Sequence, residues 1–189
     1  LFKIYLKSDS DSIKKCAENL KNGNIIIIPT DTVYGFSGIV DSVHFTQEKI
    51  KKIKGRDEKK PFIQLIACPD DIKKYTDDEI PSELLKFWPG PLTIIVHDKN
   101  SDSTTAYRCP DDEWLSAILK EVGKPVYSTS ANRSGSPLLE KISDIKKEFS
   151  SDVDLIIDGG DIIGGISSTI AAVENGKIKV LRQGSVKIC

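Results

Sequence analysis

Four consecutive isoleucines, Ile25 to Ile28, constrain the fold of this chain more than any other segment. A wholly apolar, β-branched run of this length is typical of a strand that is covered on both faces, as in α/β proteins. Residues 29–35, with the sequence Pro-Thr-Asp-Thr-Val-Tyr-Gly, follow at once and supply hydroxyls, a carboxylate and a phenol. Because ligands of open α/β sheets bind just beyond the carboxyl ends of such strands, we expect a functional site here.

Strand-like and helix-like segments alternate along most of the remaining chain. Further strands are expected at residues 3–6, 62–67, 92–97, 104–109, 125–128, 153–157, 169–174 and 177–181. Helices are expected at residues 10–21, with Ser10 as N-cap, and at 43–54, 81–87, 112–122 and 142–149. The last two strands flank Asn175-Gly176, a typical hairpin turn that requires antiparallel pairing. The pattern therefore predicts an α/β fold with a mixed parallel and antiparallel open sheet and flanking helices.

Composition narrows the class of protein. With 189 residues, of which 39% are hydrophobic, the chain can bury one substantial core, and we expect a single domain over residues 1–189. The net charge of −1 argues against a polybasic nucleic-acid or membrane protein. No apolar stretch approaches the roughly 20 residues of a membrane span, and no signal-peptide pattern begins the chain. A soluble, cytoplasmic protein is the expectation.

The cysteines do not suggest a metal site or a disulfide framework. They lie far apart in the sequence, at Cys16, Cys68, Cys109 and Cys189. Paired short spacings, which mark zinc and redox motifs, are missing. Reduced thiols are therefore expected, and no metal ligand is assigned.

A basic cluster surrounds Lys54-Gly55-Arg56. Residues 48–60 contain seven Lys or Arg and three Asp or Glu, a local balance of +4. Such a cluster beside a turn suits phosphate oxygens, which form charge-assisted hydrogen bonds with these side chains. A solvated helix face is the alternative for a lysine run taken alone.

Polar residues and arginines follow several of the other expected strands. Ser128 to Asn132 form one small polar run, and Ser167 to Thr169 form another after the glycine-rich residues 159–165. Backbone amides and hydroxyls in such loops can hold phosphate or a small polar substrate, although ordinary polar turns look the same. Arg108 and Arg182 could each clamp a carboxylate or phosphate, or form a surface ion pair.

Several common catalytic motifs are missing from the sequence. There is no Walker phosphate loop, no dinucleotide-binding glycine motif after the first strand, and no His-Glu-x-x-His helix. The two histidines, His44 and His97, have no serine or cysteine nucleophile nearby in sequence and are interpreted as structural. An enzyme of this composition would act through positioning and charge neutralisation rather than through a nucleophilic side chain.

Six motifs, taken in order and with their approximate spacing, resemble the YrdC/Sua5 family. They are residues 29–35, Lys54-Gly55-Arg56, Trp88-Pro89-Gly90-Pro91-Leu92-Thr93, Arg108-Cys109-Pro110, Ser128-Thr129-Ser130-Ala131-Asn132 and Ser168-Thr169-Ile170. The match runs through nearly the whole chain, which looks like the short, single-domain form. The resemblance implies a twisted, mixed α/β sheet around a deep basic cavity.

The resemblance also implies an activity, a nucleotidyltransfer. Members of the family make threonylcarbamoyl-adenylate from L-threonine, bicarbonate and ATP, and release pyrophosphate. Mg²⁺ would arrive with ATP. A partner transferase complex then moves the threonylcarbamoyl group to an adenosine of tRNA, which gives the t6A modification.

The family's functional residues are carried over by matching motifs. L-Threonine would be held by Thr32, Arg108, Ser130 and Ser168. ATP would be contacted by Arg56, Lys60, Thr104, Asn132 and Arg182. The catalytic charges near the phosphates would come from Lys54 and Arg56. The chain departs from the family pattern at Asp57, Leu65 and Ala171-Ala172.

Two other functions fit parts of the same pattern. A non-catalytic module that binds tRNA or double-stranded RNA could use the same basic hollow, although the net charge speaks against it. Carbamoyl-adenylate chemistry, as in the related domain of the hydrogenase-maturation carbamoyltransferases, is the third reading.

Overall fold

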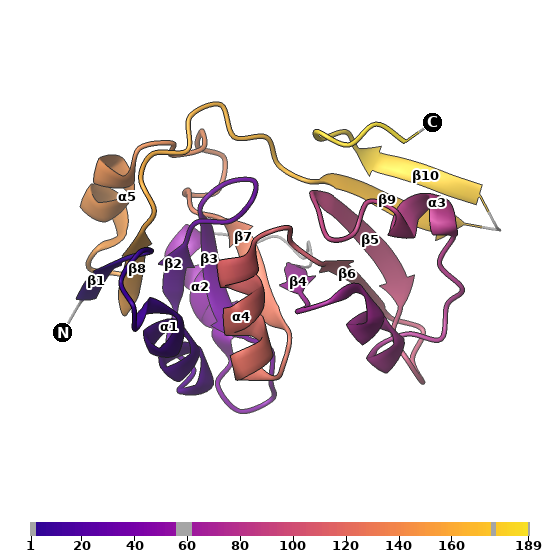
Figure 1. The fold of residues 1–189 in the computed structure, drawn as a ribbon, viewed down its shortest axis with the longest axis horizontal. Helices are drawn as coiled ribbons and strands as arrows, with labels where there is room; N and C mark the ends of the chain where they lie inside the picture. The colour runs from indigo at the N-terminus through magenta and orange to yellow at the C-terminus, as the bar shows by residue number, and fades with distance from the viewer. Residues whose placement is uncertain (1–2, 56–61, 175–176, 189) are drawn as a thin grey trace.

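The computed structural model describes residues 3–55, 62–174 and 177–188. Within these residues ten strands form one sheet, in the order β1-β8-β2-β3-β7-β4-β6-β5-β9-β10 (Figure 1). The strands are β1 Lys3–Leu6, β2 Ile26–Ile28, β3 Gly35–Ile39, β4 Ile63–Leu65, β5 Leu92–His97, β6 Thr104–Arg108, β7 Val126–Ser130, β8 Leu155–Asp158, β9 Thr169–Glu174 and β10 Lys177–Arg182. The helices are α1 Ser12–Lys21, α2 Thr46–Lys54, α3 Ser82–Leu85, α4 Glu113–Val122 and α5 Ile142–Phe149, with a 3₁₀ helix at Pro69–Lys74.

The sheet is mixed, as the sequence predicts. The pairs β1/β8, β2/β8, β4/β6 and β5/β9 are parallel. The pairs β2/β3, β3/β7, β4/β7, β5/β6 and β9/β10 are antiparallel. The antiparallel β9/β10 pair confirms the expected hairpin, although its turn lies outside the described residues.

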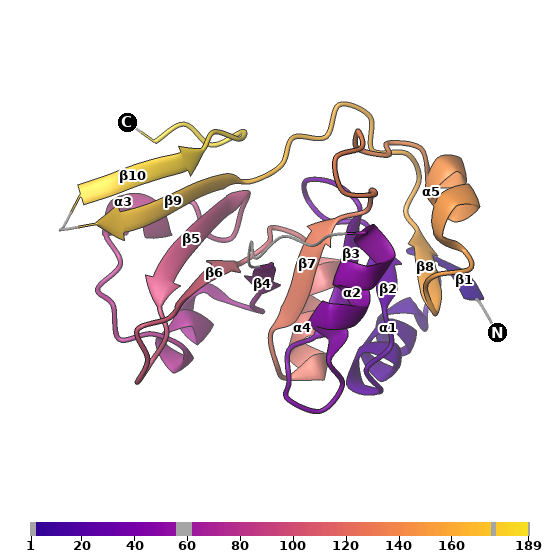
Figure 2. The same ribbon diagram turned by 180° about the vertical axis from the view of Figure 1, so that it is seen from behind.

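Helices cover both faces of the β1-to-β7 half of the sheet. Helices α1 and α4 pack on one face, where their apolar side chains join those of β2, β7 and β8 in one core cluster. Helices α2 and α5 build a second cluster on the other face. Figures 1 and 2 show α1 and α4 in front of the sheet in one view and α2 in front of it in the opposite view. A third cluster joins β5, β9, α3 and the 3₁₀ helix in the other half.

The isoleucine run is buried, as expected. Ile25 is 3% exposed and Ile26 to Ile28 are fully buried. The reason is that β2 lies between β8 and β3 and alternates its side chains between the two helix-covered faces.

Two predicted helix starts are wrong. The helix expected from Val43 begins at Thr46, because the Asp41 carboxylate accepts the backbone N–H groups of Val43 and His44, and Phe45 has a left-handed backbone with φ +52°. This turn cannot continue a helix. At the first helix the expected N-cap, Ser10, is replaced by residue 11, and α1 begins at Ser12.

The structure contains elements that the sequence did not predict. Strand β3, residues 35–39, has the sequence Gly-Phe-Ser-Gly-Ile and is buried throughout. Its two glycines and its serine are not typical of a strand, so the sequence did not predict it. The 3₁₀ helix was also missed. Strand β7 continues to Ser130, so Ser128 to Ser130 are strand residues paired with β3 rather than a loop. None of the helices in the described part of the chain is long and apolar enough to cross a membrane.

Candidate active site

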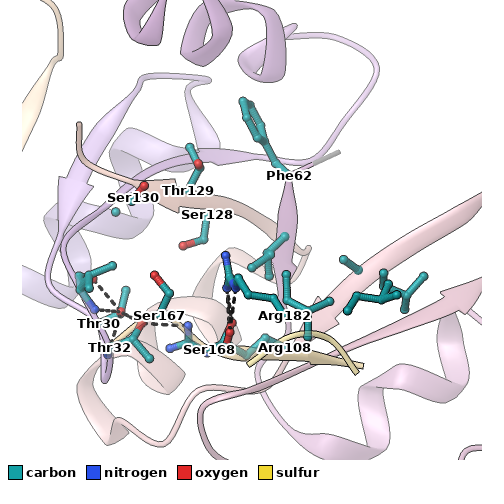
Figure 3. A pocket seen from close by; sticks show the side chains of 17 residues that line it. Thr30, Thr32, Phe62, Arg108, Ser128, Thr129, Ser130, Ser167, Ser168 and Arg182 are labelled. Atoms are coloured by element: carbon teal, nitrogen blue, oxygen red, sulfur yellow. Dashed lines mark hydrogen bonds between the residues drawn. The ribbon is translucent and has the colours of Figure 1, made fainter. Parts of the chain in front are cut away.

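A cavity of about 590 Å³ lies between the turn that follows β2 and strands β7, β4, β6, β5 and β9. Its polar wall includes Thr30, Thr32, Arg108, Ser128, Ser168 and Arg182, and its apolar wall includes Phe62, Ile63, Ile95, Ala106 and Ile170. Figure 3 shows the two arginines close to Ser168, with Phe62 on the opposite side of the cavity. The turn after β2, the end of β6 and the end of β10 all reach this cavity, as expected for ligand sites at the carboxyl ends of strands.

Arg108, the last residue of β6, is the most buried cation of the cavity, with 4% exposure. Its Nη1 donates to Thr32 Oγ1 at 3.0 Å, and its Nη2 donates to the Asp31 carboxylate. Its Nε is buried without a partner among the described protein atoms. Burial lowers the pKa of Arg108, and the charge of Asp31 opposes this shift. These two contacts use two of the five N–H groups of the guanidinium.

The side chains of Arg108, Thr32 and Thr30 form a chain of hydrogen bonds at the cavity wall. Arg108 can only donate, so Thr32 accepts from it. Thr30 Oγ1 donates to the Val33 carbonyl at 2.8 Å, accepts from the backbone N–H groups of Thr32 and Val33 at 3.2 and 3.3 Å, and lies 2.9 Å from Thr32 Oγ1. Thr32 Oγ1 therefore has the Arg108 guanidinium and the Thr30 hydroxyl as its protein partners, and Thr32 lines the cavity. The turn after the isoleucine strand therefore brings two threonine side chains to the cavity.

Arg182, at the end of β10, forms hydrogen bonds with Ser168, the residue that precedes β9. Its Nε and Nη2 donate to the Ser168 carbonyl at 3.1 and 2.8 Å, and Nη2 also donates to Ser168 Oγ at 3.2 Å. Burial lowers the pKa of Arg182, and the nearby charge of Arg108 lowers it further. Two cations that destabilise each other across one cavity favour an anionic ligand between them.

Lys54 lies behind the cavity wall. Its buried ammonium donates to the Ser130 carbonyl at 2.5 Å and to the carbonyl and side-chain oxygens of Asn132 at 2.8 and 3.1 Å. Ser130 Oγ in turn donates to Asn132 Oδ1 at 2.6 Å. The described contacts of Lys54 therefore hold the segment after β7 in place, and Ser130 reaches the cavity while Lys54 and Asn132 stand behind it.

The remaining predicted site residues lie apart from this constellation or cannot be placed. Thr104 is exposed at the start of β6, on the same face as Ala106 and Arg108 but beyond the residues that line the cavity. The predicted ATP contacts Arg56 and Lys60 lie outside the described residues. Of the two polar runs noted in the sequence, Ser128 and Ser167 line the cavity although neither was assigned a ligand.

Other side chains singled out in the sequence have structural partners. The Tyr34 hydroxyl donates to the Gly160 carbonyl at 2.7 Å and accepts from the Gly159 N–H at 2.9 Å, so it ties β3 to the segment after β8. His44 pairs with Asp41 at 2.7 Å. Leu65 is fully buried in the core. Across the described ranges there is no group of three or more His, Cys, Asp or Glu side chains that could hold a metal ion.

The structure is that of an α/β protein with a mixed open sheet and a cavity that two arginines line. Residues 18–184 match the family model of Sua5, YciO and YrdC, which carries the description "Telomere recombination". The chain therefore belongs to the Sua5/YrdC family, which confirms the resemblance drawn from the six motifs.

Named relatives and a solved structure agree with this membership. The chain is 33% identical over 201 residues to a putative threonylcarbamoyl-AMP synthase of Methanocaldococcus jannaschii, covering all of this chain and 94% of that protein. It is 28% identical to the threonylcarbamoyl-AMP synthase of Bacillus subtilis, covering 96% of this chain but only 56% of that protein. Sua5 of Pyrococcus abyssi complexed with L-threonine superposes with a TM-score of 0.81 at 29% identity, over 91% of this chain and 54% of the other. The chain thus spans about half the length of some relatives and nearly all of another.

Proposed function

We propose that this chain makes threonylcarbamoyl-AMP from L-threonine, bicarbonate and ATP and releases pyrophosphate, as a step of tRNA modification. The observation that carries the proposal is the pair of arginines, buried Arg108 and Arg182, that line one cavity together with several hydroxyl side chains. A buried cation such as Arg108 is stabilised when an anionic group pairs with it. The carboxylate of an amino acid fits this need, and the relatives' names and the threonine-bound Sua5 structure support the choice of threonine.

The chemistry suits the side chains that the cavity offers. The threonine amine and bicarbonate combine to a carbamate with loss of water, and a carbamate oxygen then attacks the α-phosphorus of ATP. The bond to the β-phosphate oxygen breaks, and pyrophosphate leaves with its electron pair. The carbamate is itself the nucleophile, so the protein only has to position the reactants and balance charge.

The residues of the site divide this work. Arg108 would bind the threonine carboxylate, while Arg182 would face phosphate oxygens, together with the basic segment whose residues 56–61 lie outside the described ranges. Lys54 would keep Ser130 and Asn132 in place beside the phosphates. The apolar wall at Ile95 and Ala106 suits an adenine ring. Mg²⁺ would enter bound to ATP, and the product would pass to a transferase complex that acts on tRNA.

The test is the release of pyrophosphate from ATP by the purified chain with Mg²⁺. Release is expected only when threonine and bicarbonate are both present, and serial omission of each reactant is the control. Release that does not depend on threonine, or its complete absence under conditions where threonine and ATP both bind, would contradict the proposal. An RNA-binding module would instead retain RNA without ATP or threonine and lose affinity steeply with salt.

A further inference from the structure

Thr93 and Ser168 form a buried pair of hydroxyls at the wall of the cavity. Their oxygens lie 2.7 Å apart, Thr93 is fully buried and Ser168 is 1% exposed. The parallel pairing of β5 with β9 places them together, because Leu92 and Thr93 are in register with Thr169 and Ile170, directly after Ser168. Ser168 lines the cavity and Thr93 stands behind it. Thr93 ends one of the six motifs, but no role has been assigned to it so far.

The direction of this hydrogen bond follows from counting protons. A hydroxyl has one proton to give and two lone pairs to accept with. Arg182 already donates to Ser168 Oγ. If Ser168 gave its proton to Thr93, the buried Thr93 proton would have no acceptor among the described groups, which is costly. Thr93 therefore donates to Ser168, which accepts from both neighbours and keeps its own proton for the cavity.

We propose that Thr93 is a positioning residue that makes Ser168 a hydrogen-bond donor to the carboxylate of the bound amino acid. The inference rests on the proposed function. Ser168 donates, and Arg108, which lines the same cavity, supplies a positive charge for the carboxylate. The carboxylate of the bound amino acid then lies toward Ser168 and Arg108.

The experiment measures binding by calorimetry to the full chain with Thr93 replaced by valine, which has the same shape but no hydroxyl. We expect the Kd of L-threonine to rise three- to tenfold, because the Ser168 proton is no longer fixed, and that of L-threoninol, which lacks the carboxylate, to change less than twofold. Thr93→Ser should restore threonine affinity to within twofold of the unaltered chain. The matched control is Thr46→Val, which removes another buried threonine hydroxyl, one that bonds to the Ile39 carbonyl and belongs to a residue that does not line the cavity.

A double-mutant cycle separates positioning from a general structural effect. In a Ser168→Ala background, Thr93→Val should weaken threonine binding by less than twofold, since the hydroxyl it orients is gone. An equal loss in both backgrounds, or equal losses for threonine and threoninol, would overturn the inference. So would normal threonine affinity of a folded Thr93→Val chain. Failure of the unaltered chain to bind threonine at all would overturn the proposed function itself, and the inference with it.

Discussion

Replacing Arg108 by methionine should separate ligand binding from folding. Methionine fills a similar volume without a charge, so the change removes the guanidinium and leaves Asp31 and Thr32 without their donor. A hydrogen bond to a charged group contributes about 1.5–3 kcal/mol. Because each 1.4 kcal/mol corresponds to a factor of ten in Kd, threonine affinity should fall roughly 10- to 150-fold.

The same change should also destabilise the fold. Breaking a buried ion pair by removing one partner costs about 3–5 kcal/mol, since the other charge is left unpaired. Asp31 keeps the Asp111 N–H at 3.2 Å and is 11% exposed, so we expect the lower end of this range. Adding Asp31→Asn to Arg108→Met removes the unpaired charge and should recover most of the stability, but none of the threonine affinity.

Two measurements check this prediction, urea unfolding followed by circular dichroism and calorimetric titration with L-threonine. The companion variant Asp31→Asn alone is the control for effects that do not involve the lost cation. The reasoning would be refuted if Arg108→Met bound threonine within twofold of the unaltered chain. It would also be refuted if the double variant were less stable than the Arg108→Met variant.

Three further perturbations test other parts of the structure. Lys54→Met should lower stability by about 1–3 kcal/mol in urea unfolding, and should slow pyrophosphate release more than it weakens threonine binding, because it frees the segment after β7. Gly184→Ala would place a Cβ 2.2 Å from the Ser167 carbonyl oxygen and 2.4 Å from the Thr169 nitrogen, so we expect at least fivefold weaker threonine binding in calorimetry; normal affinity would contradict the tight packing. Burial alone would raise the pKa of the Asp41 carboxyl, but hydrogen bonds from His44 and Val43 outweigh it and hold the pKa at about 2, below its usual value of 3.8. Its stabilisation is therefore present above pH 4 and lost as the pH falls from 4 to 2, so Asp41→Asn should destabilise the fold at pH 6 and make little difference at pH 2, as measured by urea unfolding at each pH.

The sequence predicts those parts of the fold that depend on local patterns. Strands β5 and β9 and helix α5 have the predicted bounds, because their apolar periodicity and flanking breakers are local signals. Strand β3 escaped prediction because its glycines and serine carry little strand propensity. Pairing with β2 and β7, which is a tertiary effect, makes it a strand.

The location of the candidate site was predictable from the sequence, but the hydrogen bonds among its residues were not. The turn after β2 and the ends of β6 and β10 could be named from the motifs. That Lys54 faces Ser130 and Asn132, and that Thr93 faces Ser168, depends on contacts 75 or more residues apart. Sequence spacing alone cannot show which hydroxyls form hydrogen bonds within the protein and which can still bind a ligand.

The most direct test of the account follows labelled bicarbonate in a single turnover with the purified chain, ATP, Mg²⁺ and L-threonine. The account predicts that the label enters an adduct that also contains AMP and threonine, in an amount equal to the pyrophosphate released. Label that stays in bicarbonate while both threonine and ATP are bound in the cavity would contradict it.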